Sequence, residues 1–244
     1  MANPTAAMLV IGDEILSGRT RDANMYHLAG KLTEVGINLT EVRVVSDDEP
    51  AIVAAVRALS GNYDQVFTSG GIGPTHDDIT ADCIAKAMGA NIGVRDDALK
   101  ILQAHYDRQG IEMNEARLRM ARIPDGAQLI DNPVSAAPGF SLGNVHVMAG
   151  VPAIFEAMVA GLLPTLTGGQ PLISETVRID RAEGEIAEFL NILVAEYPDL
   201  SFGSYPFRFD GAFGTNVVVR GTERDQIERA AERLRSQQGK PNSD

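Results

Sequence analysis

The feature that most constrains this chain is the stretch TSGGIGPTHDDIT at residues 68–80, where a short apolar segment leads into glycines, then acids, then a predicted helix. Three glycines within four residues let the backbone adopt positive φ and approach a ligand closely, because glycine has no Cβ. The helix that follows adds unpaired N–H groups and the positive end of its dipole. This order predicts an anion-binding loop at the end of a strand. Its candidate ligand-binding residues are Ser69, Gly70, Gly71, Gly73, Pro74 and Thr75.

Two acids in this loop need an explanation of their own. Asp77 and Asp78 stand where an anionic ligand would repel them, so either one caps the helix or at least one holds a divalent metal ion against a phosphate. Successive side chains on a helix diverge by about 100°, so two helical aspartates would not both point into one site. His76 is a weaker candidate, because no second His or Cys lies at metal-ligand spacing. The loop matches neither the dinucleotide fingerprint nor the Walker spacing.

The first 168 residues alternate between strand and helix patterns. A continuous apolar run from Ala6 to Ile11 is typical of a strand buried on both faces of a parallel sheet. Asp13 and Glu14 follow at its carboxyl end, the edge where open α/β sheets bind ligands, although solvated turn acids are the alternative. Further strands are predicted at 37–45, 65–69, 128–130 and 145–148, with amphipathic helices between them. The pattern predicts a three-layer α/β/α domain with a mostly parallel sheet over residues 1–168.

A linker-like stretch, TGGQP at residues 167–171, precedes a change of pattern. Strands are expected at 173–179, 201–206 and 216–221, and helices around 186–194 and 227–234. The order βαββα predicts a small α/β domain over residues 171–238, in which three strands are backed by two helices. It contains no glycine-rich loop or carboxylate cluster of the kind described above, so we expect a role in assembly rather than in chemistry.

Composition excludes some classes of partner. The chain has 33 acidic and 21 basic residues and a net charge of −12, which would repel nucleic acid and anionic membrane surfaces, so neither is expected as a partner. Its single cysteine, Cys83, excludes an internal disulfide, as is usual in a reducing compartment. No Lys or Arg precedes Arg19, and the first apolar run is too short for a signal peptide, so a cytoplasmic protein is expected.

Several motifs in a fixed order carry a family resemblance. They are GDEIL at residues 12–16, GGIGPTHDDIT at 70–80, NPV at 132–134 and APG at 137–139. Together they resemble the molybdopterin-binding (MoaB/Mog-like) domain, in the form found at the N-terminus of the CinA family (competence/damage-inducible protein A). By this resemblance the ligand site also includes Gly12, Asp13, Glu14, Asn24, Asn132, Ser135, Gly139 and Gly150.

The chain departs from the family pattern in two hydroxyl positions. Ala23 stands where the family usually has Thr, and Ser135-Ala136 stands where Gly-Thr is more frequent. One hydroxyl contact is therefore in doubt at residue 23, and a second is expected to shift to Ser135.

The resemblance also suggests the catalytic residues. Asp78 matches the catalytic aspartate of the family, and Asp47 stands where Mog-like enzymes carry a functional carboxylate. Both are then expected to hold a divalent ion, Mg²⁺ or similar, while Asp48 and Glu49 are interpreted as capping the next helix. A basic run, Arg117, Arg119 and Arg122, is either a phosphate contact or a solvated helix face.

Three functions remain open on this basis. The CinA resemblance implies a metal-dependent pyrophosphohydrolase acting on a nucleotide diphosphate such as ADP-ribose. The alternatives are molybdopterin binding or adenylyl transfer in molybdenum cofactor biosynthesis, and a non-catalytic module that binds a nucleotide or pterin. The resemblance also implies a homo-oligomer, a dimer or a trimer. The amidohydrolase domain of full-length CinA proteins is not expected within these 244 residues, so nicotinamide mononucleotide deamidation is not expected either.

Overall fold

The computed structural model describes residues 3–209 and 211–237. The chain divides into two compact units, and the boundary in the sequence lies between residues 169 and 170. Each unit has a hydrophobic core of its own, and each is described here by itself.

The first unit is built on a sheet of six strands in the order β2-β1-β3-β8-β7-β6. The strands are β1 (Thr5–Ile11), β2 (Asn38–Val45), β3 (Gln65–Ser69), β6 (Gln128–Ile130), β7 (Gly139–Leu142) and β8 (Val145–Met148). The pairings β2–β1, β1–β3 and β3–β8 are parallel, whereas β8–β7 and β7–β6 are antiparallel. The predicted α/β class with a mostly parallel sheet is confirmed.

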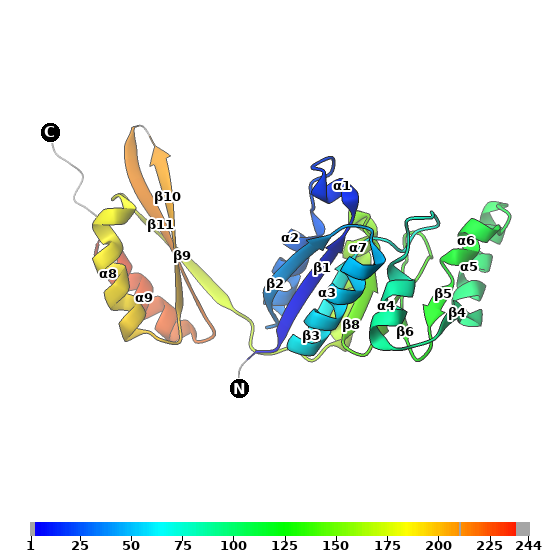
Figure 1. Cartoon of the computed structure of the whole chain (residues 1–244). Coiled ribbons are helices and arrows are strands. Elements are labelled where there is room, and N and C mark those ends of the chain that lie inside the picture. The colour runs from blue at the N-terminus through cyan, green and yellow to red at the C-terminus, as the bar shows by residue number, and fades with distance from the viewer. Residues whose placement is uncertain (1–2, 210, 238–244) are drawn as a thin grey trace. The chain divides into compact units, whose positions relative to one another are not determined.

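Helices cover both faces of this sheet (Figure 1). Their bounds are α2 (Asn24–Glu34), α3 (Glu49–Asn62), α4 (Thr80–Met88), α5 (Asp96–Gln109) and α7 (Pro152–Leu162). The apolar run of β1 explains the layering, because alternate side chains point to opposite faces. Leu9 packs in the core with α3, α4 and α5, whereas Met8 packs in the core with α2 and α7. Both side chains are fully buried.

Several short elements were not predicted. They are α1 (Asp13–Leu16), the 3-10 helix η1 (Leu163–Thr165), and the strands β4 (Ile92–Val94) and β5 (Arg122–Pro124). Strands β4 and β5 form a separate antiparallel pair. The sequence pattern predicts a helix from Asn114 to Arg122, but the helix α6 (Glu115–Arg119) is shorter, because Arg122 begins a strand. Strand β7 also lies where the sequence suggested only a loop.

The second unit has the predicted βαββα order. Its elements are β9 (Ile173–Ile179), α8 (Glu183–Glu196), β10 (Ser201–Phe209), β11 (Ala212–Gly221) and α9 (Arg224–Arg235). The strands form an antiparallel sheet in the order β10-β11-β9. Val177 and Val217 on the sheet pack against Ile186 of α8 and Ile227 of α9. In the described part of the chain, no helix combines the length and the apolar character needed to cross a membrane.

Candidate ligand-binding site

The glycine loop leaves the sheet through a sharp turn at the end of β3. Gly70 has φ 107° and Gly71 has φ 68°, a backbone region that L side chains rarely adopt. A Cβ on Gly70 would lie 2.2 Å from the backbone oxygen of Ile11. Glycine is thus required at residue 70 for two reasons, the positive φ and the close approach of β1.

Thr80, the first residue of α4, closes this loop at its base. Its Oγ1 donates to the backbone oxygen of Gly70 at 3.0 Å, and its amide donates to the oxygen of Gly71 at 3.0 Å. Within residues 3–209 and 211–237, the amides of Gly71, Ile72 and Gly73 donate to no acceptor. Three successive donors without acceptors, just before a helix start, are what an anion site requires.

The two acids of the loop lie before α4 rather than in it. The predicted alternative that one of them caps the helix is wrong, because no side chain caps α4. Oδ2 of Asp78 instead accepts hydrogen bonds from the amide of Thr75 at 2.7 Å and from its hydroxyl at 2.6 Å. The other carboxylate oxygen of Asp78 has no hydrogen bond with a described residue. His76 carries a side chain that is 98% exposed.

Asp47 follows β2 and lies beside the start of α1. Its Oδ2 accepts a hydrogen bond of 2.9 Å from the amide of Asp13. Burial raises the pKa of Asp47; the Asp13 hydrogen bond opposes this, while the charges of Asp13, Glu14 and Asp77 raise the pKa further. The sheet therefore brings together four carboxylates from three separate segments of the chain. Asp48, next in sequence, accepts from the amide of Ala51 at 3.0 Å and caps α3, as predicted.

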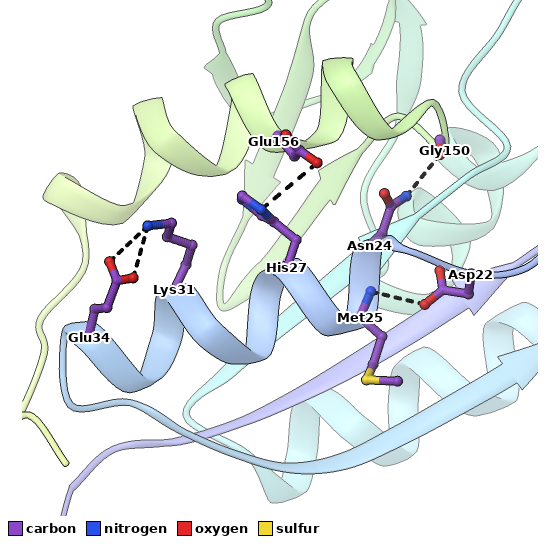
Figure 2. Close-up of polar contacts among 8 residues, drawn as sticks. All are labelled: Asp22, Asn24, Met25, His27, Lys31, Glu34, Gly150 and Glu156. Atoms are coloured by element: carbon purple, nitrogen blue, oxygen red, sulfur yellow. Dashed lines mark hydrogen bonds and ion pairs between the residues drawn. The ribbon is translucent and has the colours of Figure 1, made fainter. Parts of the chain in front are cut away.

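Asn24 links three segments behind the loop. Its Nδ2 donates to Oγ of Ser69 at 2.7 Å and to the backbone oxygen of Gly150 at 2.8 Å. Figure 2 shows this side chain reaching from the start of α2 to Gly150. Asp22 lies beside it and accepts from the amide of Met25 at 3.0 Å, although the cap position of α2 is occupied by Ala23. Asn24 is 3% exposed, so it positions the loop from within the core.

Asn132 organises a second loop in the same way. Its Oδ1 accepts from the amides of Val134 and Ser135, and its Nδ2 donates to Oγ of Ser135 and to the oxygen of Ala137. Ala136 is held at φ 63°, a strained value for a residue with a Cβ. A dense set of local hydrogen bonds thus fixes the loop that the sequence motif marks.

One hollow of about 540 Å³ gathers most of the predicted site at the carboxyl ends of the parallel strands. The predicted residues that line it are Glu14, Asp47, Gly70, Gly71, Gly73, Pro74, Asp78, Asn132, Ser135 and Gly150. The predicted residues that do not line it are Gly12, Asp13, Asn24, Ser69, Thr75 and Gly139. Gly139 instead lies where β7 and β8 approach each other closely, because a Cβ there would lie 2.3 Å from the backbone oxygen of Val147.

An apolar wall of the hollow was missed by the sequence reasoning. It consists of Ile11, Ile72, Met120, Ala149, Val151 and Ile154. Ile11 and Ile72 adjoin predicted motifs, so their positions in sequence were a usable signal. Met120 follows α6, and nothing in the local pattern indicated that it would reach this hollow.

Comparison with known proteins places the chain in a family. Residues 7–168 match the family described as "Probable molybdopterin binding domain". The chain belongs to this molybdopterin-binding domain family. Residues 171–241 match a second family, described as "FAD synthase, middle domain". The family resemblance inferred from the sequence motifs is confirmed.

Individual relatives agree with this assignment. A protein of Pyrobaculum arsenaticum is 34% identical over 96% of both chains. A "Probable FAD synthase" of Caenorhabditis elegans is 32% identical over 95% of this chain, which spans about half (49%) of that relative. The crystal structure of a CinA protein "with unknown function" from Thermoplasma acidophilum is 34% identical, covers 68% of this chain and 99% of its own, and has a TM-score of 0.62.

Proposed function

We propose that this molybdopterin-binding domain protein is a metal-dependent pyrophosphohydrolase acting on a nucleotide diphosphate such as ADP-ribose. One observation carries the proposal: the same hollow is lined by Gly71, Ile72 and Gly73, whose amides have no acceptor among the described residues, and by Asp47 and Asp78. Its volume is within the range of small-molecule sites, about 300–1,000 Å³.

The loop amides supply the binding of the diphosphate. The N–H groups of Gly71, Ile72 and Gly73 are available to phosphate oxygens, and the dipole of α4 begins just behind them. Gly150 lies just before α7, so a second helix start adjoins the hollow. The apolar wall at Ile11 leaves room for the uncharged parts of a nucleotide.

The carboxylates fit a divalent ion that the protein and its ligand hold together. The described residues contain no group of three or more His, Cys, Asp or Glu side chains placed to hold a metal ion. Mg²⁺ is often bound by one or two carboxylates and completed by substrate phosphates and water. Asp47 and Asp78 would hold it, and Asp47 already lies among carboxylates whose mutual repulsion a cation would relieve. When bound, the ion would neutralise the diphosphate and lower the pKa of water.

The protein's own acids would then handle the proton. Asp47 lines the hollow and is the carboxylate placed to accept a proton when water attacks a phosphorus atom. The amide of Asp13 holds one oxygen of this carboxylate, which fixes the direction of the other. Asp78 is fixed likewise by Thr75, so both side chains are oriented before a ligand arrives.

The comparisons with known proteins suggest which ligands to test. The relative named as a probable FAD synthase, and the match of the second unit to the FAD synthase middle domain, make FAD a second dinucleotide to test. The family description of the first unit favours molybdopterin binding as the alternative function.

The decisive experiment is incubation of the purified protein with ADP-ribose, FAD or molybdopterin, with Mg²⁺ and with EDTA. Mg²⁺-dependent release of a nucleoside monophosphate from ADP-ribose or FAD is the expected result. Tight binding of molybdopterin without turnover of either dinucleotide would favour the alternative function. Absence of turnover and of binding for all three ligands would overturn both.

A further inference from the structure

A second, smaller hollow adjoins the glycine loop. Besides residues that also line the larger hollow, among them Gly71, Gly73, Asp78 and Met120, it is lined by Asp82, Arg119 and Arg122. The loop that carries the acceptor-free amides therefore adjoins two arginines of the basic run, for which the sequence left phosphate contact and a solvated helix face as alternatives.

The three arginines of this segment differ in how they are engaged. Arg117 donates to the backbone oxygen of Glu112 at 2.6 Å, and its guanidinium lies 5.2 Å from the ring centroid of Tyr106. Arg122 forms an ion pair with Asp82. Arg119 is exposed and makes only one long hydrogen bond, 3.3 Å from Nη2 to the backbone oxygen of Asp78. Within the described chain it has no carboxylate partner.

The charges around the loop show why an arginine without a carboxylate partner matters here. The larger hollow is lined by four acids, Glu14, Asp47, Asp77 and Asp78, and by no basic residue among those described. A diphosphate bound at the loop amides would meet that negative field, which the divalent ion would offset in part, so a cationic side chain beside the loop would add to the attraction. Arg122 is already neutralised by Asp82, which leaves Arg119 as the cation beside the loop.

We infer that Arg119 is a binding residue for the diphosphate, reaching it from the smaller hollow, which shares Gly71 and Gly73 with the larger one. The inference rests on the proposed function and names the residue that selects for an anionic ligand at that site. The planar guanidinium suits two phosphate oxygens at once, which a lysine cannot reproduce. The side chain is held by a single long hydrogen bond and is free to leave the Asp78 oxygen for a stronger anionic acceptor.

A merely positioning role is the competing explanation. In that case Arg119 would only hold the Asp78 backbone in place, and any neutral donor of similar length would serve. The two explanations differ in their dependence on charge. A direct ion contact to a phosphate weakens with added salt, whereas a hydrogen bond to a backbone oxygen responds much less.

The test is calorimetric titration of the 244-residue chain with ADP-ribose in EDTA, where the ligand is bound without being hydrolysed, at low and at high salt. The proteins compared are wild type, Arg119→Gln, Arg119→Lys and the matched control Arg117→Gln. Arg119→Gln is expected to bind about 10- to 100-fold more weakly, because charge-assisted hydrogen bonds to the phosphate are lost. Its affinity should also vary less with salt than that of wild type. Arg119→Lys should recover part of the loss, and Arg117→Gln should bind as wild type does.

The outcomes separate this inference from the proposed function. If the wild type binds ADP-ribose and Arg119→Gln binds it with the same affinity, the inference about Arg119 is overturned and the proposed function is not. A loss in Arg119→Gln that keeps the wild-type salt dependence would assign Arg119 to loop positioning and also overturn it. Failure of the wild type to bind ADP-ribose or FAD would overturn the proposed function and this inference together. Circular dichroism of each variant shows that it is folded.

Discussion

The amide of Asp13 donates a 2.9 Å hydrogen bond to Oδ2 of Asp47, although the two residues are 34 positions apart. This bond joins the end of β1 to the end of β2 and fixes one carboxylate at the mouth of the hollow. The same carboxylate is partly desolvated and lies among other acids, which together raise its pKa. Such a group is costly for the folded state, and perturbed acids of this kind cluster at functional sites.

Asp47→Asn should therefore separate stability from activity. An asparagine oxygen can still accept from the Asp13 amide, and removal of a repelled charge should leave the thermal midpoint no lower than that of wild type. Metal-dependent hydrolysis of ADP-ribose should fall by about 100-fold or more if Asp47 holds the ion or accepts the proton. Asp48→Asn is the matched control, because Asp48 only caps α3 and asparagine caps about equally well. Full activity in Asp47→Asn would remove this residue from the catalytic machinery.

Asp78→Asn tests the other side of the hollow. The asparagine oxygen can still accept from the amide and hydroxyl of Thr75, so the loop should keep its shape. The charge that favours a metal ion is lost, and the turnover rate should fall far more than the affinity for ADP-ribose, which the loop amides largely supply. Steady-state kinetics and calorimetry on one preparation measure both quantities. Asp77→Asn should be milder, and an equal loss in both variants would contradict the assignment of Asp78.

Gly73→Ala should reproduce the loss of activity without touching a charged residue. The new Cβ would lie 2.6 Å from Oδ2 of Asp78, so that carboxylate must move. Gly73 does not have positive φ, and the obstructed atom ends a side chain, so the protein should fold. Gly61→Ala in α3, where a Cβ meets nothing within 4 Å, is the control. Wild-type turnover by Gly73→Ala would show that the position of Asp78 does not matter.

Much of the first unit could be predicted because its signals are local. The apolar run of β1 indicated a buried parallel strand, and the place of Asp48 before Glu49-Pro50 indicated a helix cap; both are confirmed. The glycine loop was also predictable as a unit, since its glycines are needed for backbone geometry that the structure shows at residues 70 and 71.

The features of the site that the sequence did not predict depend on the folded arrangement of the loop and on contacts between distant segments. The sequence left open whether Asp77 or Asp78 caps α4 or holds a metal ion, and it did not show that Thr75 would bind the Asp78 carboxylate before the helix begins. Asn24 and Met120 illustrate the same limit. Asn24 is buried and bonds to Ser69 and Gly150, which are both far from it in the sequence. Met120 lines the hollow together with residues from distant parts of the first unit.

A chain that ends at Gly169 should fold and bind ADP-ribose as the full chain does. The hydrophobic cores of the two units share no residue, and every residue lining the larger hollow belongs to the first unit. Gly169 must be kept, because its amide donates to the oxygen of Val35 at 3.1 Å. Calorimetry on the shortened chain measures the affinity directly. A folded but non-binding product would show that the second unit contributes to the site.

The first unit should lose stability as the pH is lowered from about 6.5 to about 4, because of His146. This side chain is 5% exposed, and burial lowers its pKa from 6.5 to about 4. With its proton on Nε2, the neutral ring donates to Oε1 of Gln65 at 2.7 Å and accepts from Oγ of Ser141 at 2.8 Å. The unfolded chain takes up a proton below pH 6.5 while the folded chain does not. The unfolded state therefore gains stability, by about 3 kcal/mol once the pH reaches 4.

Chemical denaturation across this pH range, compared between wild type and His146→Gln, measures that contribution. The variant will be less stable near neutral pH, because its side chain fits the Ser141–Gln65 pair less well, but its free energy of unfolding should depend less on pH below 6.5. His76→Gln is the control, because this side chain is 98% exposed, and its replacement should leave the wild-type slope unchanged. Carboxylates titrate in the same range in all three proteins, so only the difference in slope belongs to His146. Equal slopes in wild type and His146→Gln would mean that the buried imidazole is protonated as readily in the folded protein as in the unfolded chain.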